Sequence, residues 1–99
     1  MTEPLRLLTD DEITDALIGL PGWRRIDDKL HAGFSFHNFV AAFEFMTGVA
    51  GVAEELDHHP EWSNVYGSVT INLTNHDAGG ITELDLEMAG RINTLAGRA

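Results

Sequence analysis

The hydrophobic pattern of the chain changes its period at Asp57-His58-His59-Pro60, and this change constrains the fold most. Residues 36–56 place apolar side chains at the spacing of an amphipathic helix, whereas residues 65–74 alternate apolar and polar side chains as a half-buried strand does. Because a proline pushes the residue before it out of helical geometry, we expect the helix to end here, with His59 extended. The sequence therefore predicts a helix from about Phe36 to Leu56, then one long strand or two short strands broken near Gly67-Ser68.

The predicted long helix carries two apolar stripes on nearly opposite sides. One stripe contains Phe36, Phe39, Val40, Phe43, Met46 and Ala50, and the other contains Phe45, Val49, Val52 and Leu56. One stripe is enough to dock a helix on a sheet. We assign the first stripe to the core and the second to a subunit interface, which predicts a homodimer or homotetramer.

The segment before this helix predicts a shorter helix and a β-hairpin. Thr9 precedes Glu12 by three residues, the spacing of a capping box, and apolar residues follow at helical spacing until Pro21-Gly22, namely Ile13, Ala16, Leu17 and Leu20. Residues 23–26 predict a short strand, and residues 30–36 alternate as a second strand after a polar turn.

The C-terminal segment predicts a third helix. Thr82, with Asp85 three residues later, marks its start, and its expected buried stripe contains Leu84, Met88, Ile92 and Leu95. The order of helices and strands is that of an α+β fold in which helices pack on one face of an antiparallel sheet. With 99 residues, we expect one domain spanning residues 1–99.

Composition excludes several classes of partner. The net charge of −10, from sixteen acidic and six basic residues, argues against nucleic acid and against an anionic membrane surface. The chain has no cysteine, so it has no disulfide framework and no thiolate zinc site. No basic start followed by an apolar run marks a secretory signal, and no apolar run is long enough to span a bilayer, so we expect a cytoplasmic protein.

Three of the five histidines lie between residues 54 and 85. His58 and His59 leave the long helix together, and His76 follows the end of the strand, next to a turn where binding sites are often built. Histidine gains and loses protons near neutral pH. Acids and an aromatic residue accompany the histidines, namely Glu54, Asp57 and Trp62. The combination points to proton transfer on a flat, uncharged ligand.

Other interpretations compete with this one. Zinc sites often use histidines three to five residues apart, whereas His58 and His59 are adjacent, so a metal site is not favoured. No G-x-S-x-G elbow, cysteine nucleophile or phosphate loop is present. Trp62 also suits a core position, and Glu54 and Asp57 suit a solvated helix face. Asp85 suits the positive end of the last helix, and surface positions suit His31 and His37.

The whole string resembles the signature of the pterin-4a-carbinolamine dehydratase family. The matching positions are Glu54, His58-His59-Pro60, Tyr66, His76 and Asp85, together with the words Leu-Asp-His-His-Pro-Glu-Trp and Asn-Val-Tyr. The resemblance extends upstream to Phe34-Ser-Phe and residues 39–53, and downstream to Ile92. It departs at Gly67, where the family often has asparagine.

The resemblance implies a fold of three helices on a four-stranded antiparallel sheet, assembled as a dimer or tetramer. It implies an enzyme that dehydrates 4a-hydroxytetrahydropterin (4a-hydroxytetrahydrobiopterin) to quinonoid dihydropterin, with no metal or organic cofactor. This reaction recycles the tetrahydropterin cofactor of aromatic amino acid hydroxylases. The alternative is a non-catalytic binding or dimerisation protein of the same fold; retention of all three histidines favours the enzyme.

The same resemblance implies roles for the site residues. His58 and His76 are the candidate acid and base, and His59 binds and positions the pterin. Pro60 and Trp62 shape the wall beside the ring. The remaining acids, Glu54, Asp57 and Asp85, orient the imidazoles or accept pterin N–H groups.

Overall fold

The computed structural model describes residues 5–98, so residues 1–4 and 99 of the predicted domain, with part of the N-terminal stretch considered for a secretory signal, lie outside the description. The elements follow in the order α1 (Asp10–Ile18), β1 (Arg24–Ile26), β2 (Lys29–Ser35), α2 (Phe39–Leu56), β3 (Glu61–Val65), β4 (Ser68–Leu73) and α3 (Glu83–Leu95). The strands form one antiparallel sheet in the order β1-β2-β4-β3. The predicted three helices and four-stranded sheet are confirmed.

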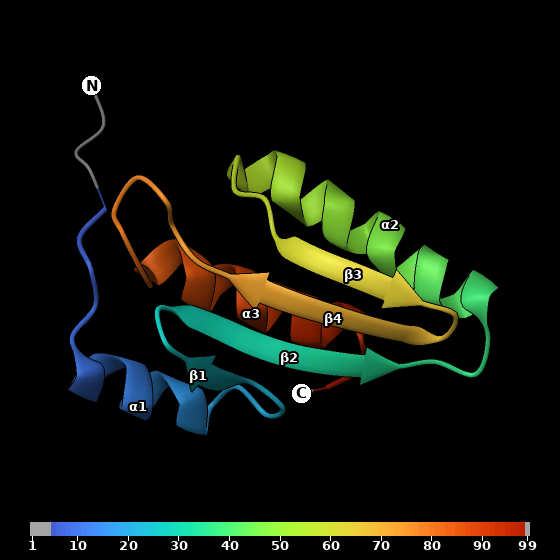
Figure 1. The fold of residues 1–99 in the computed structure, drawn as a ribbon, viewed down its shortest axis with the longest axis horizontal. Helices are drawn as coiled ribbons and strands as arrows, with labels where there is room; N and C mark the ends of the chain where they lie inside the picture. Colours follow the sequence, from blue (N-terminus) through green and yellow to red (C-terminus); the bar gives the residue numbers. More distant parts are fainter. Residues whose placement is uncertain (1–4, 99) are drawn as a thin grey trace.

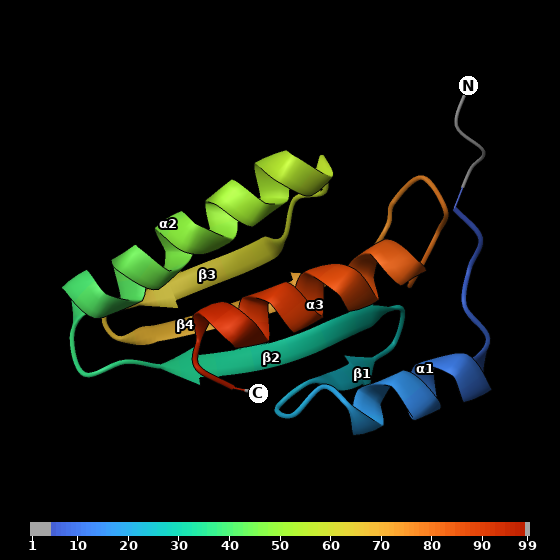
Figure 2. The ribbon, with the colours of Figure 1, turned by 180° about the vertical axis from the view of Figure 1, so that it is seen from behind.

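The two central strands supply the sheet's half of the core. Their alternation places one set of side chains under the helices, each at most 3% exposed: Leu30, Ala32, Phe34, Val69, Ile71 and Leu73. His31 and Asn72 are paired neighbours on the opposite face. Figures 1 and 2 show α2 and α3 side by side on the core face, with α1 beside β1 at the sheet edge.

A capping residue starts each of the three helices, and the sequence predicted two of these starts. Thr9 and Glu12 form the expected capping box, and Thr82 is the N-cap of α3, with its N–H donating to Asp85 Oδ2 over 2.8 Å. The long helix begins at Phe39 rather than Phe36, because Asn38 Oδ1 accepts the N–H of Ala41 over 2.8 Å and caps α2 there.

The assignment of the two α2 stripes was wrong. Phe45, Val49 and Val52, expected at a subunit interface, are at most 7% exposed and belong to the core. Phe36 and Met46 of the other stripe pack against the core as expected, but Phe39, Val40 and Phe43, which are 48%, 62% and 55% exposed, form an exposed α2 face. Both stripes satisfy the helical period, so the period alone does not choose between them.

Packing on the sheet explains which stripe of α2 is buried. The Phe45 ring lies 4.9 Å, centroid to centroid, from the rings of both Phe34 and Phe36. The small residues Ala42 and Ala53 share its buried side, so the helix can approach the strands closely. The rings of Phe34 in β2 and of Phe36 just after it therefore select the stripe that carries Phe45.

The two-strand alternative after α2 is confirmed, but β3 begins at Glu61, before the expected start, and the turn is Tyr66-Gly67. β3 is an edge strand whose apolar alternation is weak, which hid it from the pattern. Gly67 is required at the turn, since an added Cβ would lie 2.2 Å from the Phe36 carbonyl oxygen.

The expected stripe of α3 is partly wrong. Met88 and Ile92 are buried, but Leu84 is half-buried and Leu95 is 47% exposed. The polar Asn93 is buried instead, because its side chain accepts the indole N–H of Trp23 over 2.8 Å and donates to the Pro21 carbonyl. Within residues 5–98, no helix has the length and apolar character needed to cross a membrane.

Candidate active site

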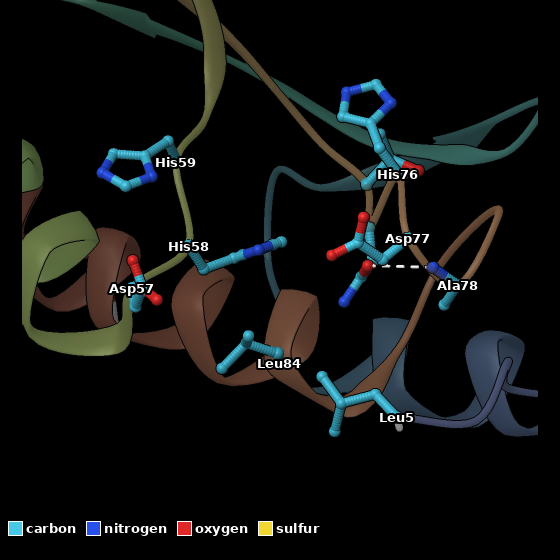
Figure 3. Close-up of a pocket in the computed structure, with 10 residues that line it drawn as sticks. Leu5, Asp57, His58, His59, His76, Asp77, Ala78 and Leu84 are labelled. Atoms are coloured by element: carbon cyan, nitrogen blue, oxygen red, sulfur yellow. Dashed lines mark hydrogen bonds between the residues drawn. The ribbon is translucent and has the colours of Figure 1, made fainter. Parts of the chain in front are cut away.

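An open cleft of about 660 Å³ lies where the α2–β3 connection, the loop after β4 and the start of α3 meet. Figure 3 shows His58 reaching across the cleft from the α2–β3 connection, with His76 and Asp77 on the facing loop. The residues that line it are Leu5, Asp57, His58, His59, Thr74, Asn75, His76, Asp77, Ala78 and Leu84.

Asp57 turns the chain at the end of α2. Its φ of 50° and ψ of 45° are left-handed, a conformation that aspartate tolerates better than most residues with a Cβ. His58 N–H still donates to the Ala53 carbonyl over 3.0 Å, so the turn stays attached to the helix. As a result His58 is buried whereas His59 is exposed.

His58 is held by a buried carboxylate. Its Nε2 lies 2.5 Å from Asp85 Oδ1, and the two side chains are 9% and 0% exposed. Asp85 Oδ2 accepts the backbone N–H of Thr82, so the group that starts α3 also orients the imidazole. Because a carboxylate only accepts hydrogen bonds, His58 Nε2 is the donor and Nδ1 keeps a free lone pair.

The other two histidines make the same kind of pair at the surface. His59 Nε2 lies 2.7 Å from Glu54 Oε2, and His76 Nε2 lies 3.0 Å from Glu61 Oε2. In all three pairs the Nε2–H donates to a carboxylate, and Nδ1 of the neutral ring keeps its lone pair.

Glu61 has a second partner, which affects its protonation. Its Oε1 lies 2.5 Å from Lys29 Nζ. The hydrogen bond from Lys29, with smaller contributions from its charge and from His76, lowers the pKa of Glu61 below its usual value. Glu61 is therefore an acceptor at neutral pH.

The structure brings most of the predicted site residues together. Asp57 and the three histidines line the cleft, and Glu54 and Asp85 pair with His59 and His58. Pro60 and Trp62 are half-buried and are not among the lining residues. Trp62 packs against the core cluster, so its contribution to a pterin wall stays a prediction.

The remaining residues of interest lie outside the cleft. His31 is half-buried on the outer sheet face, where its Nδ1 lies 2.8 Å from Asn72 Oδ1, and His37 is exposed. Tyr66, part of the matching signature, occupies the β3–β4 turn with a φ of 51° and is 66% exposed.

Sequence reasoning missed several residues of the site. Asn75 and Asp77 flank His76 in a loop closed by hydrogen bonds between Asn75 and Gly80, and their place just after a strand was the available signal. Glu61 stood within the matching word but received no role. Nothing in the pattern pointed to Leu5.

Charge limits which ligand suits the cleft. Its described lining contains the carboxylates of Asp57 and Asp77 but no lysine or arginine. Such a lining favours a neutral ligand that donates N–H groups over a phosphorylated one. Among residues 5–98, no three His, Cys, Asp or Glu side chains are arranged to share a metal ion.

Comparison with known proteins agrees with this geometry. The family model for pterin 4 alpha carbinolamine dehydratase matches residues 6–95. A protein of Prochlorococcus marinus (strain MIT 9303), named provisionally as a pterin-4-alpha-carbinolamine dehydratase, is 51% identical over 89 residues, covering 90% of this chain and 93% of that protein. A similarly named protein of Rhizorhabdus wittichii is 54% identical over 91 residues, covering 90% and 94%.

Two solved structures share the fold. A transcriptional coactivator/pterin dehydratase from Brucella melitensis is 44% identical, with a TM-score of 0.89, and the match covers 91% of this chain and 98% of that one. A pterin dehydratase-like protein described as a RuBisCO assembly factor in the alpha-carboxysome is 26% identical, with a TM-score of 0.67, covering 79% and 93%. The chain belongs to the pterin 4 alpha carbinolamine dehydratase family.

Proposed function

We propose that this protein dehydrates 4a-hydroxytetrahydropterin to quinonoid dihydropterin by histidine acid–base catalysis. The observation that carries the proposal is that three histidines, each with its Nε2 on a carboxylate, line one open cleft of about 660 Å³. The family assignment supports dehydratase activity in general, and the proposal extends it to these residues.

The reaction needs one base and one acid. The base takes the proton from pterin N5, the N5 electron pair forms a double bond to C4a, and the C4a–O bond breaks. The acid protonates the departing hydroxyl, which leaves as water. His58 and His76 supply these two groups through Nδ1: the base is a neutral ring with a lone pair on Nδ1, and the acid is an imidazolium that carries a proton on Nδ1 as well as on Nε2. Each transfer is worth roughly 10²–10⁴ in rate.

The other side chains hold the reactants. Asp85 fixes the tautomer and direction of His58, and Glu54 does the same for His59, which positions the pterin. Asp57 also lines the cleft, and its carboxylate accepts pterin N–H groups. By resemblance, the substrate is 4a-hydroxytetrahydrobiopterin released by an aromatic amino acid hydroxylase.

A stopped-flow assay tests the proposal. Freshly made 4a-hydroxytetrahydropterin is mixed with protein, and the ultraviolet absorbance of quinonoid dihydropterin is followed against the uncatalysed rate. We expect acceleration by the wild type and by His37→Ala, an exposed histidine outside the cleft. A wild-type rate equal to the uncatalysed rate contradicts the proposal.

A second candidate is a protein-binding role, which the exposed α2 face favours. Phe39, Val40 and Phe43 leave apolar surface in water although the core is complete without them. We propose that a second copy of the chain covers this face in a homodimer or homotetramer, since the resemblance implies such assemblies. The relative described as an assembly factor motivates the alternative of another protein as occupant. Light scattering of the pure protein separates the two, because only self-association raises its mass.

A further inference from the structure

Glu61 connects three elements next to His76, which lines the cleft. It is the first residue of β3, Lys29 is the first residue of β2, and His76 lies in the loop after β4, the strand between them. One carboxylate oxygen of Glu61 contacts Lys29 Nζ at 2.5 Å, and the other contacts His76 Nε2 at 3.0 Å.

The side chain of His76 depends on this contact for its direction. The imidazole is 75% exposed, and within residues 5–98 Glu61 is the one residue that forms a hydrogen bond with the ring. In Figure 3 the ring stands at the rim of the cleft, while Leu84 and Leu5 lie at the opposite side. Without Glu61, the solvent-exposed ring would be free to rotate among its rotamers.

We propose that Glu61 is a positioning residue for His76, anchored by Lys29, and that it keeps the proton of the neutral imidazole on Nε2 so that Nδ1 faces the ligand as a base. This inference rests on the proposed dehydration for its kinetic part only. Glu61 acts on His76 as Asp85 acts on His58 and as Glu54 acts on His59, so one arrangement is used three times.

An ordinary surface ion pair is the competing explanation. Lys29, Glu61 and His76 are all partly exposed, and such pairs typically stabilise a fold by at most about 1 kcal/mol. The two explanations differ in what they predict: a surface pair affects stability slightly, whereas a positioning residue affects the tautomer of His76 and the rate.

The first measurement is the tautomer of His76, read from ¹⁵N chemical shifts of histidine-labelled protein at a pH where the ring is neutral. We expect Nε2–H in the wild type. In Glu61→Gln the amide both donates and accepts, so Nδ1–H should become populated. Glu55→Gln, which makes the same change in the Glu55–Arg91 surface pair, is the matched control and should leave the tautomer unchanged. An unchanged His76 tautomer in Glu61→Gln overturns the inference.

The second measurement is the rate of dehydration. We expect Glu61→Gln to lower kcat roughly tenfold with little change in KM. This is the lower end of the effect of removing a carboxylate partner from an imidazole, because Glu61 and His76 are both exposed to water, which weakens their interaction. Lys29→Met should keep the tautomer, because the carboxylate remains, and lower kcat less. Circular dichroism confirms that each variant is folded.

The outcomes of the two measurements separate the inference from the proposed function. A tautomer change with a wild-type kcat overturns positioning in catalysis. If the wild type accelerates no dehydration, the proposed function fails, and the tautomer measurement still decides whether Glu61 sets the state of His76.

Discussion

Replacing Asp85 by asparagine tests the central pair of the site. The carboxylate now accepts two hydrogen bonds in a fully buried position, one from His58 Nε2–H at Oδ1 and one from the Thr82 N–H at Oδ2. An asparagine side chain has one oxygen and one NH₂ group, so it accepts at one end and donates at the other. If its oxygen accepts the Thr82 N–H, its NH₂ faces His58 and forces the proton of that imidazole onto Nδ1.

The magnitude follows from these two contacts. Loss of a charge-assisted hydrogen bond in a buried site destabilises the fold by roughly 1.5–3 kcal/mol. The rate should fall by roughly 10²–10⁴, the contribution of one acid or base, because His58 is left in the wrong tautomer and loses the carboxylate that stabilises its protonated form. Asp85→Ala should cost more stability, about 3–5 kcal/mol, since two buried donors lose their partner.

Three measurements on Asp85→Asn check this prediction. Urea unfolding gives the change in stability, stopped-flow dehydration gives kcat, and ¹⁵N shifts give the tautomer of His58. A folded Asp85→Asn protein with wild-type kcat would refute the assignment of His58 as acid or base. So would an unchanged Nε2–H tautomer accompanied by a large loss of rate.

Four further predictions follow from the same structure. His58→Ala or His76→Ala should each lower kcat by at least ~10²-fold, and the double variant should lose less than the product of the two, because the groups act as a unit. The rate should be unchanged by a chelator, and a loss restored by zinc would refute this. Val40→Glu should weaken the homo-oligomer in light scattering, since burial of the exposed α2 face contributes roughly 1.5–3 kcal/mol per large apolar side chain. The hydrogen bond from Arg6 lowers the pKa of Glu12 from 4.5 to about 2. The ionised Glu12 therefore stabilises the fold fully above pH 4.5, and this stabilisation is lost as the pH falls through about 2. The urea midpoint of Glu12→Gln should lack this part of the pH dependence.

Local signals predicted most of the fold. The capping box at Thr9 and the N-cap at Thr82 are set by contacts within four residues, and a sequence pattern contains such contacts directly. The stripe of α2 that packs on the sheet was not predictable in this way. It depends on the rings of Phe34 and Phe36, which lie outside α2 and contact Phe45 only once the helix has folded back over the sheet.

The error in α2 changes which substitution reports on assembly. Val49 is fully buried beneath the sheet, so Val49→Glu would unfold the core rather than separate subunits. Val40 is 62% exposed, and a charge there is solvated in the monomer. A charge on the exposed α2 face therefore distinguishes loss of assembly from loss of folding, whereas one at Val49 does not.

The site was more predictable than the interface because its parts are close in the sequence. His58 and His59 share one turn with Glu54, and the turn itself is set by Asp57 and Pro60. The pairing of His58 with Asp85 joins residues 27 apart, yet both sit at helix ends whose positions the caps determine. Glu61 was missed because its role exists only when β2 and the loop after β4 meet it across the sheet. Contacts across the sheet thus hold the ring of His76, whereas the turn at Asp57 separates a buried His58 from an exposed His59 and leaves the His58 ring to be fixed by Asp85.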